Sequence, residues 1–525
     1  MFFSDADDRG HLPTRSGVIG SFGDITMSCF DYFFSDVAMD QRLGLFSAFG
    51  DLANTMIDPP IGMGGDEPAQ NNDIAPLYSY IGQLLSHDLV APRTDGDPLG
   101  DGHPALSLNT PDLIPLERDT VTAVIKNGRS GGLHLESIYG DALGTAQARA
   151  LRDPDDPALM RLSTSRDGPN PLGDARNASS LLLSNLVSVL LAFHNAVASD
   201  LRDTYGDADE RHAEARRRVC WTWQWLIIND YLPAICDPIT LSWVYSARAP
   251  LYRAFYARHS GLGDVFPIPI EFAFAVTGLP HTMLRAAYDL NSEFGRPQVT
   301  DARDGVPLED LLGLSDLAED APIAIDWARL IAPPAAYPDR AARRFDTGLA
   351  HTLGWLSAAD GNLPTNLAAR MLNAGYRLSM PTAQGALAAL AQHDSLHETH
   401  PPLVPLSAGE IGSGETGYIV RRHGFVDRTP LWFYLLKEAE IRHGGEHLGA
   451  LGSRLLAETL IGLLISDPDS FWHAPSDRAG AWTPERMPVG QTAVISFAGL
   501  FQAAGVISND LPPGGSISSG VFTGV

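Results

Sequence analysis

The helical periodicity of the apolar residues is the feature that most restricts the fold of this chain. In Ser179–Leu201 and His212–Tyr231, apolar residues recur every three or four positions with charged residues between them, as in amphipathic or buried helices. Few runs alternate at period two, so the sequence predicts a mainly α fold with little β structure. Other stretches with helical periodicity are Pro76–Val90, Ile270–Leu290, Leu363–Asn373, Ala383–Gln392, Pro430–Arg442 and Leu448–Ile465.

Proline and glycine divide the chain into three parts. Residues 1–75 contain a Pro/Gly-rich stretch and read as an irregular N-terminal arm, and residues 512–525 read as a flexible tail. Residues 76–511 show no internal repeat and no break in composition, which favours one large helical domain. Within it, proline, glycine and aspartate recur every few residues from Ala91 to Pro171, which predicts long loops of the kind that often carry sites.

The charge of the chain excludes one class of partner. The 63 acidic residues outnumber the 37 basic residues, giving a formal net charge of -26 at pH 7. A surface this acidic repels phosphate backbones, so we expect no nucleic-acid partner. The three cysteines, Cys29, Cys220 and Cys236, have neither the spacing of a metal site nor the even number of a disulfide framework.

The sequence also gives expectations about location. The N-terminus lacks a basic region followed by an apolar run, so we expect no cleaved signal peptide. No window holds the ~18 uninterrupted apolar residues of a membrane span. We therefore expect no membrane span and a cytoplasmic location, with export lacking a cleaved signal as the alternative.

The segment YSYIGQLLSHDLVAP places two polar residues on one face of an apolar helix. Gln83 and His87 are four residues apart and share that face, while Asp88 is turned away by about 100°. By itself, such a histidine is more often a hydrogen-bonded core residue than a catalyst. Two further residues have the same ambiguity: Arg176 could pair with Asp174 in a loop, and His281, which follows a proline, could cap a turn.

Several motifs that follow one another along the chain resemble those of a known family, and this resemblance favours a functional role for these residues. GQLLSHDL, with His87, resembles the distal-histidine helix of animal-type haem peroxidases, in the peroxidase-cyclooxygenase superfamily. GDARN, with Arg176, resembles the distal-arginine motif, and IPIEFAFAVTGLPHTMLRAAYDLN resembles the proximal-histidine helix, with His281 as the match. NLAARMLNAGYRLSMPTAQ and the segment from TPLWFYLLKEAEIRH onward resemble C-terminal segments of the bacterial branch. The resemblance extends from about residue 76 to 472.

The resemblance implies a single haem-peroxidase helical domain that uses hydrogen peroxide. His87 would take a proton from one peroxide oxygen and return it to the departing oxygen. Arg176 would offset the negative charge that develops there, and Gln83 would order a water or small anion nearby. His281 would bind the haem iron as a neutral imidazole.

Some positions depart from the family pattern. Ser86 and Ser179 stand where several mammalian members have the carboxylates that esterify haem, which implies non-covalent haem b. Gly278 replaces an arginine that pairs with a haem propionate, and Met371 replaces the asparagine that bonds the proximal imidazole. A further family arginine corresponds to Ala374.

These replacements leave the anchoring of haem open. Arg370, Arg343 and Arg344 are the candidates for binding the propionates. Some family members are fatty-acid dioxygenases with a tyrosine three residues before the proximal histidine. The glycine at that position disfavours a tyrosyl-radical dioxygenase.

Calcium is a second candidate cofactor. Asp88 and Ser130 match calcium ligands of the family, and Glu136 lies in the same loop. His134 stands where an aspartate is expected, and histidine is a poor ligand for a cation that prefers oxygen. The sequence leaves calcium binding open.

The leading hypothesis is a haem peroxidase that reduces hydrogen peroxide and oxidises a small organic or halide donor. The altered residues around His281 allow two alternatives. One is a specialised haem oxygenase or tailoring enzyme on the same scaffold, and the other is a degenerate, non-catalytic binding module.

Overall fold

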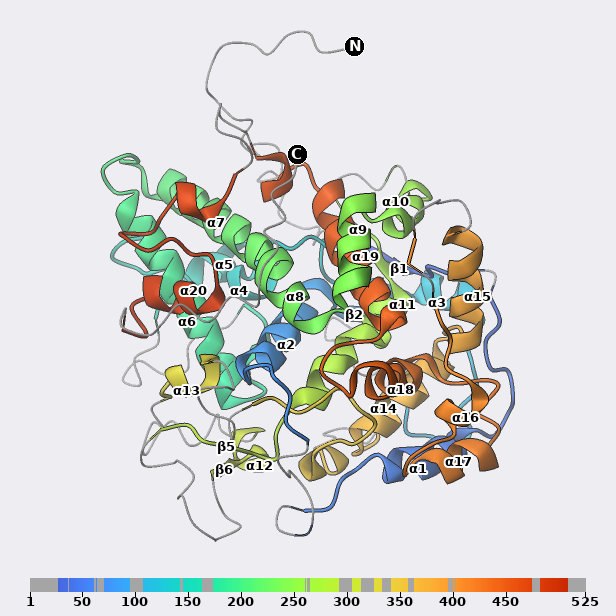
Figure 1. Cartoon of the computed structure of the whole chain (residues 1–525). Coiled ribbons are helices and arrows are strands. Elements are labelled where there is room, and N and C mark those ends of the chain that lie inside the picture. Colours follow the sequence, from blue (N-terminus) through green and yellow to red (C-terminus); the bar gives the residue numbers. More distant parts are fainter. Residues whose placement is uncertain are drawn as a thin grey trace.

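The chain folds into a mainly helical structure with a few short strands (Figure 1). This computed structural model describes residues 27–35, 37–60, 63, 70–94, 107–141, 145–162, 173–259, 261, 265–291, 305–312, 325–332, 341–356, 363–394, 400–401, 403–474 and 482–508. The predicted fold class is confirmed. The predicted tail at 512–525 lies outside the described residues.

The helices that build the centre come from separate parts of the chain. α2 (Leu77–Leu89) lies in the middle of the molecule in Figure 1. It packs against α4 (Glu136–Tyr139), α6 (Leu181–Asp200) and the 3₁₀ helices η4 (Ala175–Ala178) and η6 (Val276–Met283). The bounds of the helices of eight residues or more are α1 Phe46–Thr55, α6 Leu181–Asp200, α7 Ala208–Leu226, α9 Pro238–Ala247, α10 Pro250–Ala257, η6 Val276–Met283, α14 Leu367–Arg377, α15 Ala383–Asp394, α18 Leu431–His443 and α19 Ala450–Ser466.

Shorter helices connect these. Those used below are α3 (Arg118–Val124), α4 (Glu136–Tyr139), η4 (Ala175–Ala178), the π-helical turn η5 (Ile227–Tyr231), α8 (Leu232–Ile235), α11 (Ile270–Phe274) and α20 (Phe497–Ala503). The remaining short helices are α5 Thr145–Ala150, α12 Leu308–Leu312, α13 Ala328–Ile331, η8 His351–Gly354, α16 Ala408–Ile411, α17 Gly417–Arg422, η9 Phe471–His473 and η10 Pro484–Arg486.

The strands form two small sheets. The larger sheet has the order β2-β3-β1-β4, in which β1–β3 and β2–β3 are antiparallel and β1–β4 is parallel; the smaller pairs β5 with β6. In β1–β3, Ser28 lies opposite Asn127. The strands are β1 Ser28–Asp31, β2 Pro92–Thr94, β3 Ile125–Asn127, β4 Ile268–Pro269, β5 Ala287–Tyr288 and β6 Val306–Pro307.

The N-terminal part differs from the irregular arm that we expected. Within the described residues 27–60, β1 joins the larger sheet and α1 packs against α14. Phe49 and Leu52 of α1 are buried in the core. These short elements carry too few apolar repeats to stand out in a Pro/Gly-rich stretch, and long-range packing stabilises them.

The predicted helix at Ile270–Leu290 is wrong in detail. The chain forms α11, breaks at Ala275, continues as the 3₁₀ helix η6 and then enters strand β5. Pro280 has no backbone N–H, and its ring would clash with the carbonyl of residue 276 in an α-helix, so the tighter 3₁₀ geometry replaces the α-helix there. The other predicted helices are present, with ends shifted by a few residues.

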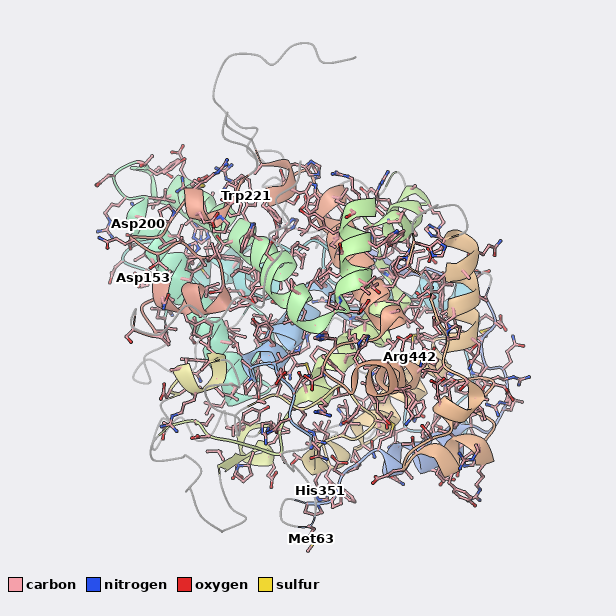
Figure 2. All side chains as sticks on the ribbon, in the orientation of Figure 1. Met63, Asp153, Asp200, Trp221, His351 and Arg442 are labelled. Carbon is pink, nitrogen blue, oxygen red and sulfur yellow. The ribbon has the colours of Figure 1, made fainter. Side chains whose placement is uncertain are left out.

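Side chains fill the interior around the central helices, and labelled Asp153 and Asp200 lie toward the edge of the molecule on the side of α6 (Figure 2). The helix α6 is long and apolar enough to cross a membrane by length and composition. However, 61% of the relevant window is buried inside the protein, as in the core helix of a soluble protein. This helix therefore gives weak support for a membrane span, and the absence of a span stays a prediction.

Candidate functional site

The helix α2 carries the two polar residues that the sequence singled out. Gln83 is buried and His87 is half-buried, and both lie on one side of a helix whose other residues are mostly apolar and buried. The Nε2 of Gln83 is buried without a hydrogen-bond partner in the described part of the chain. An unpaired buried amide costs about 1–3 kcal/mol, so this atom indicates a partner that a bound group or a water would supply.

Asn177 holds the His87 imidazole in one orientation. The Nδ1 of His87 lies 2.9 Å from the Oδ1 of Asn177. The amide Nδ2 of Asn177 donates to the Ser137 carbonyl at 3.0 Å, which fixes the amide oxygen toward the imidazole. Since that oxygen can only accept, the Nδ1 of neutral His87 carries the proton and its Nε2 has the lone pair. Asn177 is fully buried.

The pKa of His87 keeps the imidazole neutral near neutral pH. Burial and, to a smaller extent, the charge of Arg176 lower this pKa to about 3, against the raising effect of the bond to Asn177. A smaller lowering comes from the charge of His281. A neutral imidazole with a free lone pair can act as a base.

Arg176 lies beside the C-terminal end of α2, in the turn η4. Its Nη1 donates to the Val90 carbonyl at 2.8 Å and its Nη2 to the His87 carbonyl at 3.0 Å. Its Nε and Nη2 also donate to the Asp174 carboxylate, at 3.1 and 2.7 Å. These bonds use four of the five guanidinium N–H groups, which leaves one on Nη1 for a ligand. Both interpretations of Arg176, the ion pair with Asp174 and the position beside His87, describe the same side chain.

A second buried arginine supports this arrangement. Arg129 forms an ion pair with Asp174, and its Nε donates to the His87 carbonyl at 3.1 Å. Burial raises the pKa of Asp174, but Arg176 and Arg129 outweigh this effect, so the pKa of that carboxyl lies well below its usual range. Asp174 therefore stays ionised and holds both guanidinium groups against the end of α2.

His281 lies in η6, which packs directly on α2. A Cβ added to Gly82 of α2 would lie 2.5 Å from the Cγ of Pro280, so only glycine permits this approach of the two helices. Burial lowers the pKa of His281 to about 4. His87 and His281, 194 positions apart in the sequence, thus lie on two helices that pack on each other.

The proximal imidazole lacks the bond that the family pattern would provide. The Nδ1 of His281 is buried and has no hydrogen-bond partner among the described residues, although the Gly278 backbone raises the pKa of His281. The methyl of Met371 lies 2.2 Å from the position of a Cβ on Gly278, and the Trp432 Nε1 lies 3.1 Å from it. A thioether therefore fills the space beside Gly278, where no larger residue would fit.

The three arginines that the sequence proposed as anchors lie in different settings. The charge of Arg370 lowers the pKa of His281, so this side chain lies near the imidazole. Arg343 is fully buried, pairs with Asp58, and its backbone N–H donates to the Met283 carbonyl at the end of η6. Arg344 pairs with Glu446 at 3.2 Å. Arg370 and Arg343 stay candidates for anchoring a carboxylate.

The residues proposed for calcium are already hydrogen-bonded to other groups of the protein. The Asp88 carboxylate accepts from the backbone N–H groups of residues 135 and 137, at 3.0 and 3.2 Å. Glu136 accepts from the backbone N–H of Ser130 at 3.1 Å and from its hydroxyl. The Nε2 of His134 lies 2.6 Å from the Asp467 carboxylate. Among the residues that the structure describes, no group of three or more His, Cys, Asp or Glu residues could hold a metal ion.

A small cavity lies between α2 and η6. Its volume is about 20 Å³, room for a water-sized molecule and far below the ~300–1,000 Å³ typical of ligand pockets. Ser86 and Pro280, which directly precede the two histidines, line it together with Thr277 and Tyr231. The remaining lining residues are mostly apolar, namely Gly82, Leu85, Ile235, Phe272, Val276, Leu279, Phe345, Leu448 and Leu456.

Comparison with known families finds one match, to part of the chain. Residues 122–319 match the model of the animal haem peroxidase family. This segment is therefore similar to an animal haem peroxidase domain. The matched residues include Arg176 and His281, whereas Gln83 and His87 precede them.

Solved structures of animal haem peroxidases and their relatives share the fold. Peroxidase A from Dictyostelium discoideum matches with 13% identity over 86% of this chain and 89% of its own, at a TM-score of 0.53. Fatty acid alpha-dioxygenase from Oryza sativa matches with 14% identity over 80% of this chain and 72% of its own, at a TM-score of 0.54. The Arabidopsis thaliana alpha-dioxygenase matches with 13% identity over 90% and 76%, at a TM-score of 0.54. No curated protein matches the sequence.

Animal haem peroxidases bind haem, and this chain has side chains whose chemistry suits that group. His87 and His281 lie on two helices that pack on each other, burial favours their neutral form, and a neutral imidazole is a ligand for haem iron. The buried, unpartnered Nε2 of Gln83 lies on the same face of α2 as His87. Ser86, which lines the neighbouring cavity, and the exposed Ser179 offer hydroxyls rather than carboxylates, so neither can form an ester of the kind that several family members have.

Sequence reasoning missed two residues of the site. Asn177 stands in the GDARN motif without a predicted role of its own, and Arg129 directly precedes the calcium candidate Ser130 without one. A buried Asn beside a predicted catalytic arginine is a weak signal, since only the fold brings residue 177 to residue 87.

Proposed function

We propose that this chain is a haem-dependent peroxidase that reduces hydrogen peroxide and oxidises a small organic or halide donor. The observation that carries the proposal is the pair of neutral imidazoles, His87 and His281, on two helices in direct contact. Haem b, bound without a covalent link, supplies the redox-active iron, and His281 would hold that iron. Calcium in the loop of Asp88 stays an untested candidate.

His87 would handle the proton in this reaction. Asn177 keeps the proton on Nδ1, so the Nε2 lone pair can take a proton from one peroxide oxygen and return it to the other, which leaves as water. Because the pKa of His87 is lowered to about 3, the imidazole is ready to accept a proton throughout the physiological range. The remaining N–H of Arg176 and the amide of Gln83 would stabilise the negative charge on the departing oxygen.

The test begins with the purified chain loaded with haem. Wild type should show a haem absorption band, lose the haem in acid and organic solvent, and oxidise a phenol only when peroxide is added. His281→Ala should lose most of the bound haem. His87→Ala should keep the haem but react with peroxide about 10²–10⁴-fold more slowly, the range of a general acid–base group.

An exposed imidazole provides the matched control. His473→Ala removes a histidine at the surface and should leave both haem binding and the peroxide reaction unchanged. If His87→Ala reacts with peroxide as fast as His473→Ala, the assignment of His87 is wrong. If wild type binds no haem under conditions that load other haem proteins, the chain is a binding module rather than a peroxidase.

A second candidate function is a specialised haem oxygenase that acts on one metabolite. The surroundings of His281 favour this candidate, because Gly278 and Met371 stand where the family pattern has polar residues. The similar fold of the alpha-dioxygenases is compatible with it. Here Gly278 contacts Met371 and leaves no side chain to carry a tyrosyl radical at that position. A well-formed haem spectrum without oxidation of any generic donor would support this candidate.

A further inference from the structure

A row of aromatic rings connects the cavity between α2 and η6 with the outside of the helix. Tyr231 lines the cavity, and its hydroxyl lies 2.5 Å from the position of a Cβ on Gly82. Its ring stacks on that of Tyr78, with centroids 6.3 Å apart and planes 13° apart. The Tyr78 ring also contacts Phe497 of α20, at 6.0 Å. Tyr78 is half-buried, whereas Tyr231 is fully enclosed.

Tyr78 has a proton acceptor at its hydroxyl. The Tyr78 hydroxyl donates to the Oδ1 of Asp230, and the Oδ2 of the same carboxylate accepts from the backbone N–H of Phe497 at 2.8 Å. Burial raises the pKa of Asp230, which makes this carboxylate a better base than an exposed aspartate. Burial and the charge of Asp230 raise the pKa of Tyr78 well above its ordinary value, so the phenol stays protonated.

The π-helical turn η5 brings these groups together. Asp230 and Tyr231 are adjacent in sequence, and both contact α2, one through the Tyr78 hydroxyl and the other through the Tyr78 ring. In a regular α-helix, adjacent side chains point about 100° apart. The wider π turn changes this spacing locally, and π turns occur often at functional sites.

We propose that Tyr78 is a one-electron oxidation site through which phenolic or aromatic-amine donors too large for the cavity deliver electrons, by way of Tyr231, to the centre between α2 and η6. The inference rests on the proposed function, because hydrogen peroxide is the oxidant. A cavity of about 20 Å³ admits a water-sized molecule but no phenol or aromatic amine, whereas Tyr78 is partly exposed to solvent.

The electrons and protons balance in this route. Reduction of one hydrogen peroxide to two waters needs two electrons and two protons. For each electron, Tyr231 transfers one inward while it keeps its hydroxyl proton, and takes one from Tyr78, whose hydroxyl proton moves to Asp230. The Tyr78 radical then takes an electron from the donor, Asp230 returns the proton, and the donor becomes a radical by losing one electron and one proton. Two donors are oxidised for each peroxide.

Two conservative variants and one control test the route. Tyr78→Phe and Tyr231→Phe keep the rings and remove the hydroxyls, and Tyr418→Phe removes the hydroxyl of an exposed tyrosine elsewhere. With peroxide, kcat/KM for a bulky phenol, such as a phenol linked to a soluble polymer, should fall at least about tenfold in the first two variants. The rate of the reaction with peroxide itself, followed without a donor, should stay within about twofold of wild type in all three. Equal rates on the bulky donor in wild type and Tyr78→Phe would overturn the proposal.

A second measurement needs no bound haem. Photo-oxidation of the purified chain with a soluble sensitiser and an electron acceptor should give a tyrosyl radical, seen by electron paramagnetic resonance, that is lost in Tyr78→Phe and retained in Tyr418→Phe. Asp230→Asn keeps both rings but removes the base, and should lower the radical yield at neutral pH. A radical unchanged in Tyr78→Phe would refute the proposal. If wild type turns over no donor at all but forms the radical at Tyr78, the proposed function fails while the oxidation site stands.

Discussion

Replacing Asn177 by leucine tests most directly how the distal imidazole is held. The variant Asn177→Leu keeps a branched side chain of similar length but removes the amide. Two hydrogen bonds are lost: the one of 2.9 Å to the His87 Nδ1 and the one of 3.0 Å to the Ser137 carbonyl. Asn177 is fully buried, so water does not readily replace either bond.

The size of the effect follows from these two bonds. A hydrogen bond contributes about 1 kcal/mol net, so the form of His87 with its proton on Nδ1 loses about five- to tenfold in population. Misorientation of the ring adds to this loss, and complete loss of the base sets a ceiling of about 10²–10⁴-fold. We therefore expect the peroxide reaction of Asn177→Leu to slow by about 10- to 100-fold. The buried Ser137 carbonyl, left without its donor, should lower the free energy of unfolding by about 1–3 kcal/mol.

Stopped-flow absorption of the haem-loaded protein mixed with peroxide measures this rate. Because the pKa of His87 is lowered to about 3, the wild-type rate should be flat from about pH 5 to 8. In Asn177→Asp, the added carboxylate would raise the pKa of His87, so the rate should fall as the pH falls within that range. A haem-loaded Asn177→Leu that matches wild type, or a flat profile in Asn177→Asp, would refute the assigned role.

Three further predictions concern packing, protonation and the proximal ligand. Gly82→Ala places a methyl against η6, so it should lower the free energy of unfolding by about 1–3 kcal/mol and weaken haem binding in a titration. In the control Gly50→Ala the methyl meets open space, so neither quantity should change. Burial lowers the pKa of His212 to about 2, so the free energy of unfolding should fall as the pH drops below about 6.5, by up to ~1.4 kcal/mol per pH unit. Urea titrations at several pH values should show a weaker dependence of this free energy on pH in His212→Phe than in wild type. Met371→Asn offers an acceptor to the His281 Nδ1 and should lower the reduction potential of the bound haem in spectroelectrochemistry; an unchanged potential would show that the amide does not reach the imidazole.

The fold was predictable where periodicity is strong. The apolar spacing of Ser179–Leu201 gave the helix α6 almost to its ends, because a long buried helix repeats its pattern over several turns. The segment Ile270–Leu290 has a similar apolar content but is broken at Ala275, and Pro280 makes the following turn tighter. Periodicity cannot distinguish an α from a 3₁₀ geometry over so few residues.

The sequence predicted the candidate catalytic and iron-binding residues of the site, but not the residues that hold them in place. The motifs around His87 and His281 identified residues on two helices that the fold packs on each other. The motif around Arg176 did not reveal that four of its five N–H groups are used by the Asp174 carboxylate and by two carbonyls of α2. Such bonds depend on backbone atoms, which the sequence does not distinguish, and on contacts across about 90 positions.

The two sides of the site differ in how firmly their imidazoles are held. Asn177 binds the His87 ring, and the two arginines beside Asp174 bind the backbone carbonyl of His87. The Nδ1 of His281 has no such bond among the described residues, and Met371 fills the adjacent space with a thioether. Since outer contacts orient a ligand and tune its metal, the distal contacts should govern the rate of proton transfer, and the proximal contacts should govern haem affinity and potential. Substitutions on the two sides should therefore change different measured quantities, which makes the roles of the two histidines separable by experiment.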